Sequence, residues 1–477
     1  MLSLYRSFSG SIFTTFLASA TRNMTTRSLL SDAARRAATY LEGLPNRSVA
    51  PSAEAVAALD HFDRPLPEHP QDPSRVLSDL DELGSPGTGA SAGGRYFGFV
   101  IGATLPTALA ANMLATAWDQ NCGLVVISPT TAKLESIALR WVLDALHLPP
   151  ECAAGFVTGA TMANFTCLAA ARHSLLQRAA WDVEAQGLFG APTLNVVVGD
   201  EVHVTALKAL AMLGLGRARV TRVPVDAQGR MRADSLPPLD DRTILCLQAG
   251  NVNTGAIDPL AELIPRARAA GAWVHVDGAF GLWAAAAPER AALVAGIENA
   301  DSWAIDAHKW LNVPYDSGIA ICRDKGALRG ATAVSAAYLV QGEQREPSEY
   351  TPELSRRARG VDVWAAMSSL GRSGIAEMIE RNCRQAARFA AGLRDAGYEI
   401  LADVVLNQVL VSFGDDESTR RVIAGIQADG TCWCGGTVWQ GRTAMRISVS
   451  SWATTDEDVE LSLAAMIRVA SEVHAVR

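Results

Sequence analysis

A lysine and a histidine stand side by side in the segment Asp306-Ala-His308-Lys309-Trp310. The run that precedes them is apolar enough to form a strand, so Lys309 is expected at a strand end among apolar and aromatic neighbours. An amine in such surroundings can form an imine with an aldehyde. Taken alone, the segment is more simply interpreted as a solvated loop in which the aliphatic part of Lys309 lies along Trp310.

Three further segments place polar or small residues directly after predicted strands. Asp277 ends the run 273–277 and is followed by Gly278 and Ala279, and His203 follows the apolar run 194–198. Gly159-Ala160-Thr161 precedes a predicted helix, whose first N–H groups can bind an anion. Each segment alone also fits an ordinary turn. Because the carboxyl ends of parallel strands share one edge of a sheet, the four together predict a single site for a phosphorylated aromatic aldehyde, pyridoxal 5′-phosphate.

On these motifs the sequence resembles the group II pyridoxal-phosphate-dependent decarboxylases, which act on aromatic amino acids, glutamate or diaminobutyrate. The resemblance spans about residues 33–470 and is most specific at 306–310. It implies a homodimer with sites near the subunit interface, and decarboxylation of an L-amino acid to the amine and CO₂ through a quinonoid intermediate. It also implies that Lys309 forms the aldimine, that Asp277 pairs with the pyridinium nitrogen, that His203 stacks on the ring, and that Ala279 lies against it.

The same resemblance implies the groups around the cofactor phosphate and the lysine. These are Gly159, Ala160, Thr161, Ser302, Asp306 and His308. The acid that protonates Cα is expected on a loop after the lysine, where Tyr350 is the first candidate and Tyr338 the second; a plain surface tyrosine is the alternative.

One segment departs from the family pattern. Asn251 and Val252 stand where many members have a hydroxyl residue near the cofactor, which affects substrate preference more than reaction class. Tyr96, Phe97 and Trp118 favour a hydrophobic or aromatic amino acid as substrate, although all three could equally be core residues. The alternative reactions are oxidative decarboxylation-deamination to an aldehyde and transamination.

The elements that must position these residues alternate between strands and helices from about residue 100, which predicts an α/β fold with a mostly parallel sheet and helices on both faces. This agrees with fold type I of the pyridoxal-phosphate-dependent transferases. We divide the chain into a leader (1–30), an N-terminal helical arm (31–95), a large cofactor-binding domain (96–370) and a small C-terminal α+β domain (371–477). Predicted strands include 194–198, 243–247, 273–276 and 318–322.

Composition limits the remaining function classes. The 477 residues include 49% hydrophobic residues and carry a net charge of −8, which argues against a nucleic-acid-binding protein, and no apolar run is long enough to span a membrane. The eight cysteines are scattered as buried thiols would be, and Cys432 and Cys434 lack further ligands for a metal. We expect a cytoplasmic protein; an N-terminus rich in Arg, Ser and Thr and free of Asp and Glu up to Asp32 makes a mitochondrial transit peptide the alternative.

Overall fold

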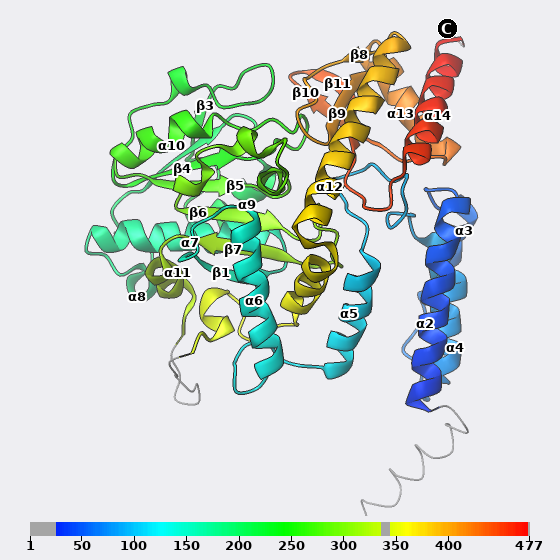
Figure 1. Ribbon diagram of the computed structural model, residues 1–477, viewed down its shortest axis with the longest axis horizontal. Helices are drawn as coiled ribbons and strands as arrows, with labels where there is room; N and C mark the ends of the chain where they lie inside the picture. Colours follow the sequence, from blue (N-terminus) through cyan, green and yellow to red (C-terminus); the bar gives the residue numbers. More distant parts are fainter. Residues whose placement is uncertain (1–24, 335–343, 476–477) are drawn as a thin grey trace, which may run out of the picture.

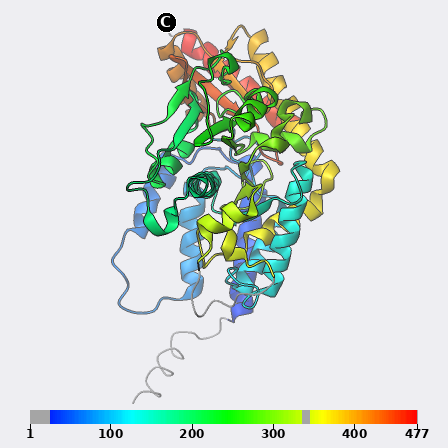
Figure 2. The ribbon, with the colours of Figure 1, turned by 90° about the vertical axis from the view of Figure 1, so that its left-hand side faces the viewer.

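The computed structural model describes residues 25–334 and 344–475. A helical arm, a large domain around a seven-stranded sheet and a small domain around a four-stranded sheet follow one another along the chain (Figure 1). The view from the side places the small domain, in orange and red, at one end of the molecule (Figure 2). Among the described residues, no helix combines the length and the hydropathy that crossing a bilayer requires.

The large domain confirms the predicted mostly parallel sheet. Its strand order is β1-β7-β6-β5-β4-β2-β3, and only β7 runs antiparallel to its neighbours β1 and β6. The strands are β1 (Ala153–Val157), β2 (Asn195–Gly199), β3 (Thr221–Val223), β4 (Thr243–Gln248), β5 (Trp273–Asp277), β6 (Ser302–Asp306) and β7 (Gly318–Cys322). Every residue of β5, β6 and β7 is buried, as expected for a sheet with helices on both faces.

The two faces of the sheet are covered by different helices. Helices α7, α9 and α11 pack on one face and share a core with Trp273 and Cys246, whereas α6, α10 and the start of α12 pack on the other with Val274 and Leu245. The helices are α6 (Pro129–Ala145), α7 (Ala160–Arg178), α8 (Val183–Gln186), α9 (Val204–Met212), α10 (Leu260–Ala269) and α11 (Lys325–Thr332). Alternation along a strand therefore directs odd-numbered residues of β5 and even-numbered residues of β6 toward α7.

The small domain is joined to the large one by the long helix α12 (Arg359–Asp395). Gly371 interrupts this helix with φ 62°, in the left-handed region that favours glycine, next to the predicted domain boundary. An antiparallel sheet of order β10-β11-β9-β8 follows. Its elements are β8 (Glu399–Ile400), β9 (Gln408–Ser412), α13 (Asp416–Asp429), β10 (Gly435–Trp439), β11 (Arg442–Ser448) and α14 (Asp456–Ala475).

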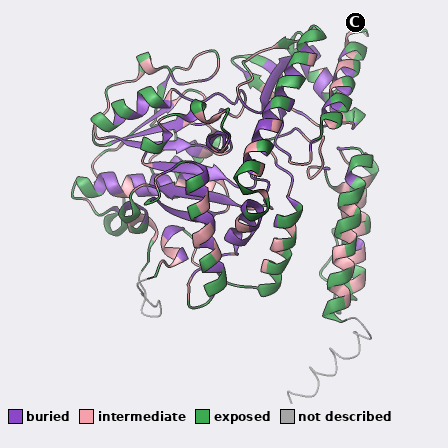
Figure 3. Cartoon of the chain, in the orientation of Figure 1, coloured by how far each residue is buried: buried purple, intermediate pink, exposed green. Residues whose placement is uncertain are grey.

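The arm consists of α2 (Thr26–Gly43), α3 (Ala53–Ala57) and α4 (Pro73–Asp79), and α5 (Pro106–Trp118) follows it. Helix α2 begins earlier than the predicted start of the arm at residue 31, because Thr25 and Ser28 form a capping box there. The predicted leader otherwise lies outside the described residues. No residue of α2 is buried, and its surface is exposed or intermediate along its whole length (Figure 3).

Candidate functional site

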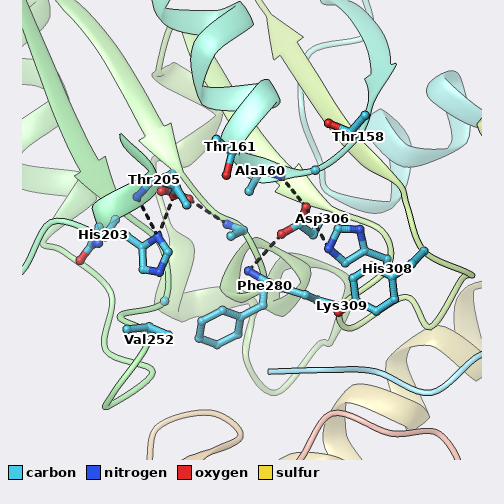
Figure 4. Close-up of a pocket in the computed structure, with 16 residues that line it drawn as sticks. Thr158, Ala160, Thr161, His203, Thr205, Val252, Phe280, Asp306, His308 and Lys309 are labelled. Carbon is cyan, nitrogen blue, oxygen red and sulfur yellow. Dashed lines mark hydrogen bonds and ion pairs between the residues drawn. The ribbon is translucent and has the colours of Figure 1, made fainter. Parts of the chain in front are cut away.

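Most of the predicted site residues gather around one cavity of about 350 Å³ at the edge of the large sheet (Figure 4). Its walls come from the carboxyl ends of β1, β2, β4, β5 and β6 and the residues that follow them, which is the edge where ligands of open α/β sheets bind. Nine of the predicted residues line the cavity: Gly159, Ala160, Thr161, His203, Asp277, Ala279, Asp306, His308 and Lys309.

A buried carboxylate connects the lysine to the start of α7. Lys309 Nζ lies 3.0 Å from Asp306 Oδ2, and the Ala160 N–H donates to Asp306 Oδ1 over 2.6 Å. The first N–H of α7, which the sequence suggested would be available to an anion, thus already has an acceptor. A carboxylate with 3% of its surface exposed needs such donors, and the positive end of a helix suits it.

Glycine at position 159 keeps the turn before α7 open. A Cβ on Gly159 would lie 3.1 Å from His308 Cε1 and 3.3 Å from Asp306 Oδ1. Thr158 and Thr161 also line this part of the cavity and bring hydroxyl groups (Figure 4). Small residues, hydroxyls and a histidine are what a phosphate group requires, so this end of the cavity fits the phosphate of pyridoxal 5′-phosphate.

His308 stands beside this turn in a fixed orientation. Its Nδ1 accepts a hydrogen bond from the Ser317 N–H over 3.0 Å, so Nε2 carries the proton in the neutral ring. The ring also stacks on Tyr315 with 4.2 Å between centroids. Burial lowers the pKa of His308 below its usual value, which favours this neutral form.

His203 presents a neutral imidazole to the cavity. It is the N-cap residue of α9, and the Thr205 N–H donates to its Nδ1 over 3.3 Å while the Thr205 hydroxyl lies 2.7 Å from the same atom. Since a backbone N–H can only donate, the proton of the ring is on Nε2. Burial lowers the pKa of His203, so the ring is expected to stay uncharged near neutral pH.

Asp277 lies at the end of β5 with 7% of its surface exposed. Its Oδ1 accepts the Ala279 N–H over 3.2 Å and its Oδ2 accepts Asn164 Nδ2 over 3.0 Å. Asn164 belongs to the glycine-turn segment, but sequence reasoning assigned it no role. Its position one turn into α7 is the signal that could have identified it, because that turn faces the ends of β5 and β6.

Two residues predicted for the site lie elsewhere. Ser302 is the first residue of β6, at the opposite end of the strand from Asp306, and its hydroxyl contacts Trp273 and His275 rather than the cavity. Tyr350 ends the short helix η9 (Pro347–Tyr350) and is 2% exposed.

Tyr350 packs in the apolar core under α7 and α9, and Arg345 Cζ lies 4.6 Å from its ring centroid. Neither Ser302 nor Tyr350 therefore lines the cavity of its own chain, and the geometry of the site does not support either assignment. The second candidate for the proton donor, Tyr338, lies outside the described residues.

Five lining residues were missed from the sequence: Thr205, Gln248, Gly250, Phe280 and Tyr315. Thr158 and Val252 line the cavity as well. Val252 lines the cavity, whereas Asn251 is 1% exposed and its Oδ1 accepts the Asn253 N–H over 2.9 Å.

The three aromatic residues singled out from the sequence do not line this cavity. Phe97 is buried in the core of the small domain, Tyr96 stacks on Trp433, and Trp118 is 42% exposed on α5. Within the described residues, no group of three or more His, Cys, Asp or Glu side chains is placed to hold a metal ion.

Comparison with known proteins gives consistent matches. The pyridoxal-dependent decarboxylase conserved domain matches residues 57–414. The aromatic-L-amino-acid decarboxylase of Bacillus atrophaeus is 27% identical over 74% of this chain and 75% of its own length. The 4-hydroxyphenylacetaldehyde synthase of Rhodiola rosea is 26% identical over 88% of this chain and 90% of its own. The crystal structure of Oryza sativa TDC with PLP and tryptamine superposes with a TM-score of 0.87 at 22% identity, over 95% of this chain and 99% of that one, and supports the fold.

Proposed function

The chain belongs to the pyridoxal-dependent decarboxylase family, and from that premise we propose that it removes the carboxylate of an aromatic L-amino acid as CO₂ and releases the amine. It is a pyridoxal-phosphate-dependent amino acid decarboxylase. The observation that carries the finer proposal is that Lys309, Asp277, His203 and the Gly159 turn line one cavity together with apolar and aromatic side chains.

Bound pyridoxal 5′-phosphate supplies a ring that accepts the electrons left on Cα when CO₂ departs. Lys309 Nζ would hold the cofactor covalently, and Asp306, 3.0 Å away, fixes the position of this amine. Asp277 would hold a proton at the pyridine nitrogen, because a nearby negative charge favours the cationic form. The Gly159 turn, Thr161 and His308 would bind the phosphate.

His203 orients the reacting groups. Its flat ring would lie against the cofactor, and because it is neutral it would not repel a protonated pyridine ring. The two Thr205 contacts to Nδ1 fix the orientation of the ring and leave its Nε2–H free to donate to the substrate carboxylate. Ala279, which also lines the cavity, is small enough to admit a flat ring.

Substrate preference follows from the apolar lining. Val252, Phe280 and Tyr315 present methyl groups and aromatic rings to the cavity, which suits an aromatic side chain. The relative from Bacillus atrophaeus is named as an aromatic-L-amino-acid decarboxylase, which supports the same class.

A second candidate function is conversion of the amino acid to CO₂ and an aldehyde. The relative from Rhodiola rosea carries that kind of name, and Tyr350, one candidate for the Cα proton donor, lies outside the cavity. The two outcomes differ in whether Cα receives a proton after CO₂ leaves.

One assay separates these functions. The purified protein with pyridoxal 5′-phosphate is given a panel of aromatic, acidic and basic L-amino acids, and CO₂, amine and aldehyde are measured for each. We expect CO₂ and amine in equal amounts from aromatic substrates alone. Borohydride reduction followed by peptide mass spectrometry should place the cofactor on Lys309, and Lys309→Ala should lose both the label and the activity. Aldehyde in place of amine would establish the second function, and CO₂ from glutamate alone would refute the aromatic assignment.

We further propose that the protein is a homodimer. The arm presents large apolar side chains to solvent, among them Leu30 (57% exposed), Leu66 (92%) and Leu80 (55%), and α5 adds Leu114 (58%). These side chains come from α2, the loop before α4, the turn after α4 and α5, and exposed apolar side chains of this size are typical of a surface that is covered by a partner. A second copy of the chain is the partner that the proposal names.

A further inference from the structure

Asp277 is the end of a chain of hydrogen bonds that runs through the interior of the large domain. Trp273 Nε1 contacts Ser302 Oγ at 2.9 Å, and Ser302 Oγ contacts His275 Nδ1 at 2.9 Å. His275 Nε2 contacts Asn164 Oδ1 at 2.8 Å, and Asn164 Nδ2 contacts Asp277 Oδ2 at 3.0 Å. Ser302, His275 and Asn164 are each 0% exposed.

The fold explains why these side chains meet. His275 and Asp277 are two residues apart on β5, so both point toward α7, and His275 is paired with Ser302 of β6 in the strand register. Asn164, one turn after the start of α7, lies over both strand residues. The chain of contacts therefore spans two neighbouring strands and the helix that covers them.

Only one direction of proton donation satisfies every group in this chain. An indole N–H can only donate and an ionised carboxylate can only accept, so Ser302 Oγ accepts at one end and the Asn164 amide NH₂ donates at the other. Asn164 then presents its carbonyl oxygen to His275, which must donate from Nε2. The remaining His275 nitrogen, Nδ1, is an acceptor and receives the Ser302 hydroxyl proton.

Burial supports this assignment. It lowers the pKa of His275 to about 4, so the ring is neutral at physiological pH and carries a single proton. A neutral ring with that proton on Nε2 is the one form that fits both of its neighbours.

We infer that Asn164, His275 and Ser302 are positioning residues that deliver a fixed N–H donor to Asp277 and keep its carboxylate aimed at the cavity. This inference rests on the proposed role of Asp277 at the pyridine nitrogen. A donor on the carboxylate favours its charged form. The proton shared between the Asp277 carboxylate and the pyridine ring would therefore stay on the ring nitrogen. A protonated ring accepts electrons from Cα more readily than a neutral one.

The size of the effect follows from the kind of bond that is lost. Hydrogen bonds to charged groups typically change an equilibrium constant by about ten- to a hundredfold. We therefore expect Asn164→Leu to weaken cofactor binding by about tenfold or more and to shift the proton from the ring nitrogen toward Asp277. His275→Phe should act in the same direction, because it removes the donor that orients Asn164. His275→Gln, whose amide can donate from the same place as Nε2, should restore wild-type behaviour.

The test measures the protonation state of the cofactor ring by NMR rather than the activity of the enzyme. The protein is reconstituted with pyridoxal 5′-phosphate labelled with ¹⁵N in the ring, and the ¹⁵N chemical shift reports whether the ring nitrogen carries a proton. We expect a protonated nitrogen in the wild type and in His275→Gln, and loss of that proton in Asn164→Leu and His275→Phe. A protonated nitrogen in both apolar variants would overturn the inference.

Two further measurements keep the outcome decisive. If Asp277→Ala also leaves the ring nitrogen protonated, the proposed role of Asp277 has failed; if Asp277→Ala removes the proton and Asn164→Leu does not, only the present inference has failed. Should the apolar variants not fold, ¹⁵N-histidine spectra of the wild-type holoenzyme decide the matter, with His275→Gln identifying the signal. We expect a neutral His275 ring with its proton on Nε2. A proton on Nδ1 or on both nitrogens would refute the proposed chain of hydrogen bonds.

Discussion

Replacing Gly159 by alanine tests the phosphate cradle with a single added methyl group. The backbone of Gly159 is extended, with φ 164°, so alanine adopts it without strain. The new Cβ would lie 3.1 Å from His308 Cε1 and 3.3 Å from Asp306 Oδ1. Overpacking of this kind costs roughly 1–3 kcal/mol, and because it displaces groups that hold the phosphate, we expect cofactor binding to weaken about 5- to 150-fold.

The assay is titration of the apo-protein with pyridoxal 5′-phosphate, followed by absorbance or fluorescence, with thermal unfolding of the apo-protein measured alongside. Gly43→Ala is the matched control, because a Cβ there meets no atom within 4 Å and the residue lies on the arm at the end of α2. A dissociation constant for Gly159→Ala within about twofold of the control would show that the phosphate binds elsewhere, and the reasoning from the Gly159 turn would be wrong.

Three other perturbations address the proton donor, the assembly and the pH dependence. Tyr350→Phe should leave the ratio of amine to aldehyde unchanged, since Tyr350 is 2% exposed outside the cavity, whereas Tyr338→Phe should raise the aldehyde; the reverse pattern would restore Tyr350 as the donor. Leu30→Glu on the arm should shift the mass measured by light scattering toward the monomer, and Phe189→Glu, at a residue 98% exposed on the large domain, should not. Burial lowers the pKa of His275 from 6.5 to about 4, so as the pH falls the imidazole is protonated in the unfolded chain before it is protonated in the folded protein. The free energy of unfolding should therefore fall as the pH drops below 6.5, by up to about 3 kcal/mol near pH 4. Urea denaturation should show this loss in the wild type and a smaller one in His275→Gln; equal slopes would contradict it.

The strands and their ends could be predicted because their apolar runs are continuous. The runs at 243–247, 273–276 and 318–322 became β4, β5 and β7 within one residue, since a strand buried on both faces needs apolar residues at nearly every position. Once the strands are assigned, Asp277 is located at the carboxyl end of one strand and Lys309 just after the carboxyl end of the next. Sequence spacing alone was therefore enough to bring these residues to one cavity.

Contacts that depend on the pairing register of neighbouring strands could not be predicted from the sequence. The family resemblance placed Ser302 with Asp306 among the groups around the phosphate and the lysine, but a strand of five residues puts these two at opposite ends. Its true partners follow from the pairing of His275 with Ser302, which no local pattern in the sequence specifies. Tyr350 was misplaced for a related reason: a polar segment predicts a loop but does not show which of its side chains turns inward.

The two carboxylates of the cavity, Asp277 and Asp306, both accept hydrogen bonds from the first turn of α7. The Ala160 N–H donates to Asp306 and the Asn164 side chain donates to Asp277, and the two donors are four residues apart on the same face of the helix. A shift of α7 along its axis would therefore move the donors of both carboxylates together, and with them the partner of Lys309 and the proposed partner of the pyridine nitrogen. This coupling explains why the small residues of the turn matter beyond the phosphate. The close contact between Gly159 and Gly318, where a Cβ on Gly318 would lie 2.4 Å from Gly159 Cα, holds the start of the helix against β7 and so fixes the position of both donors.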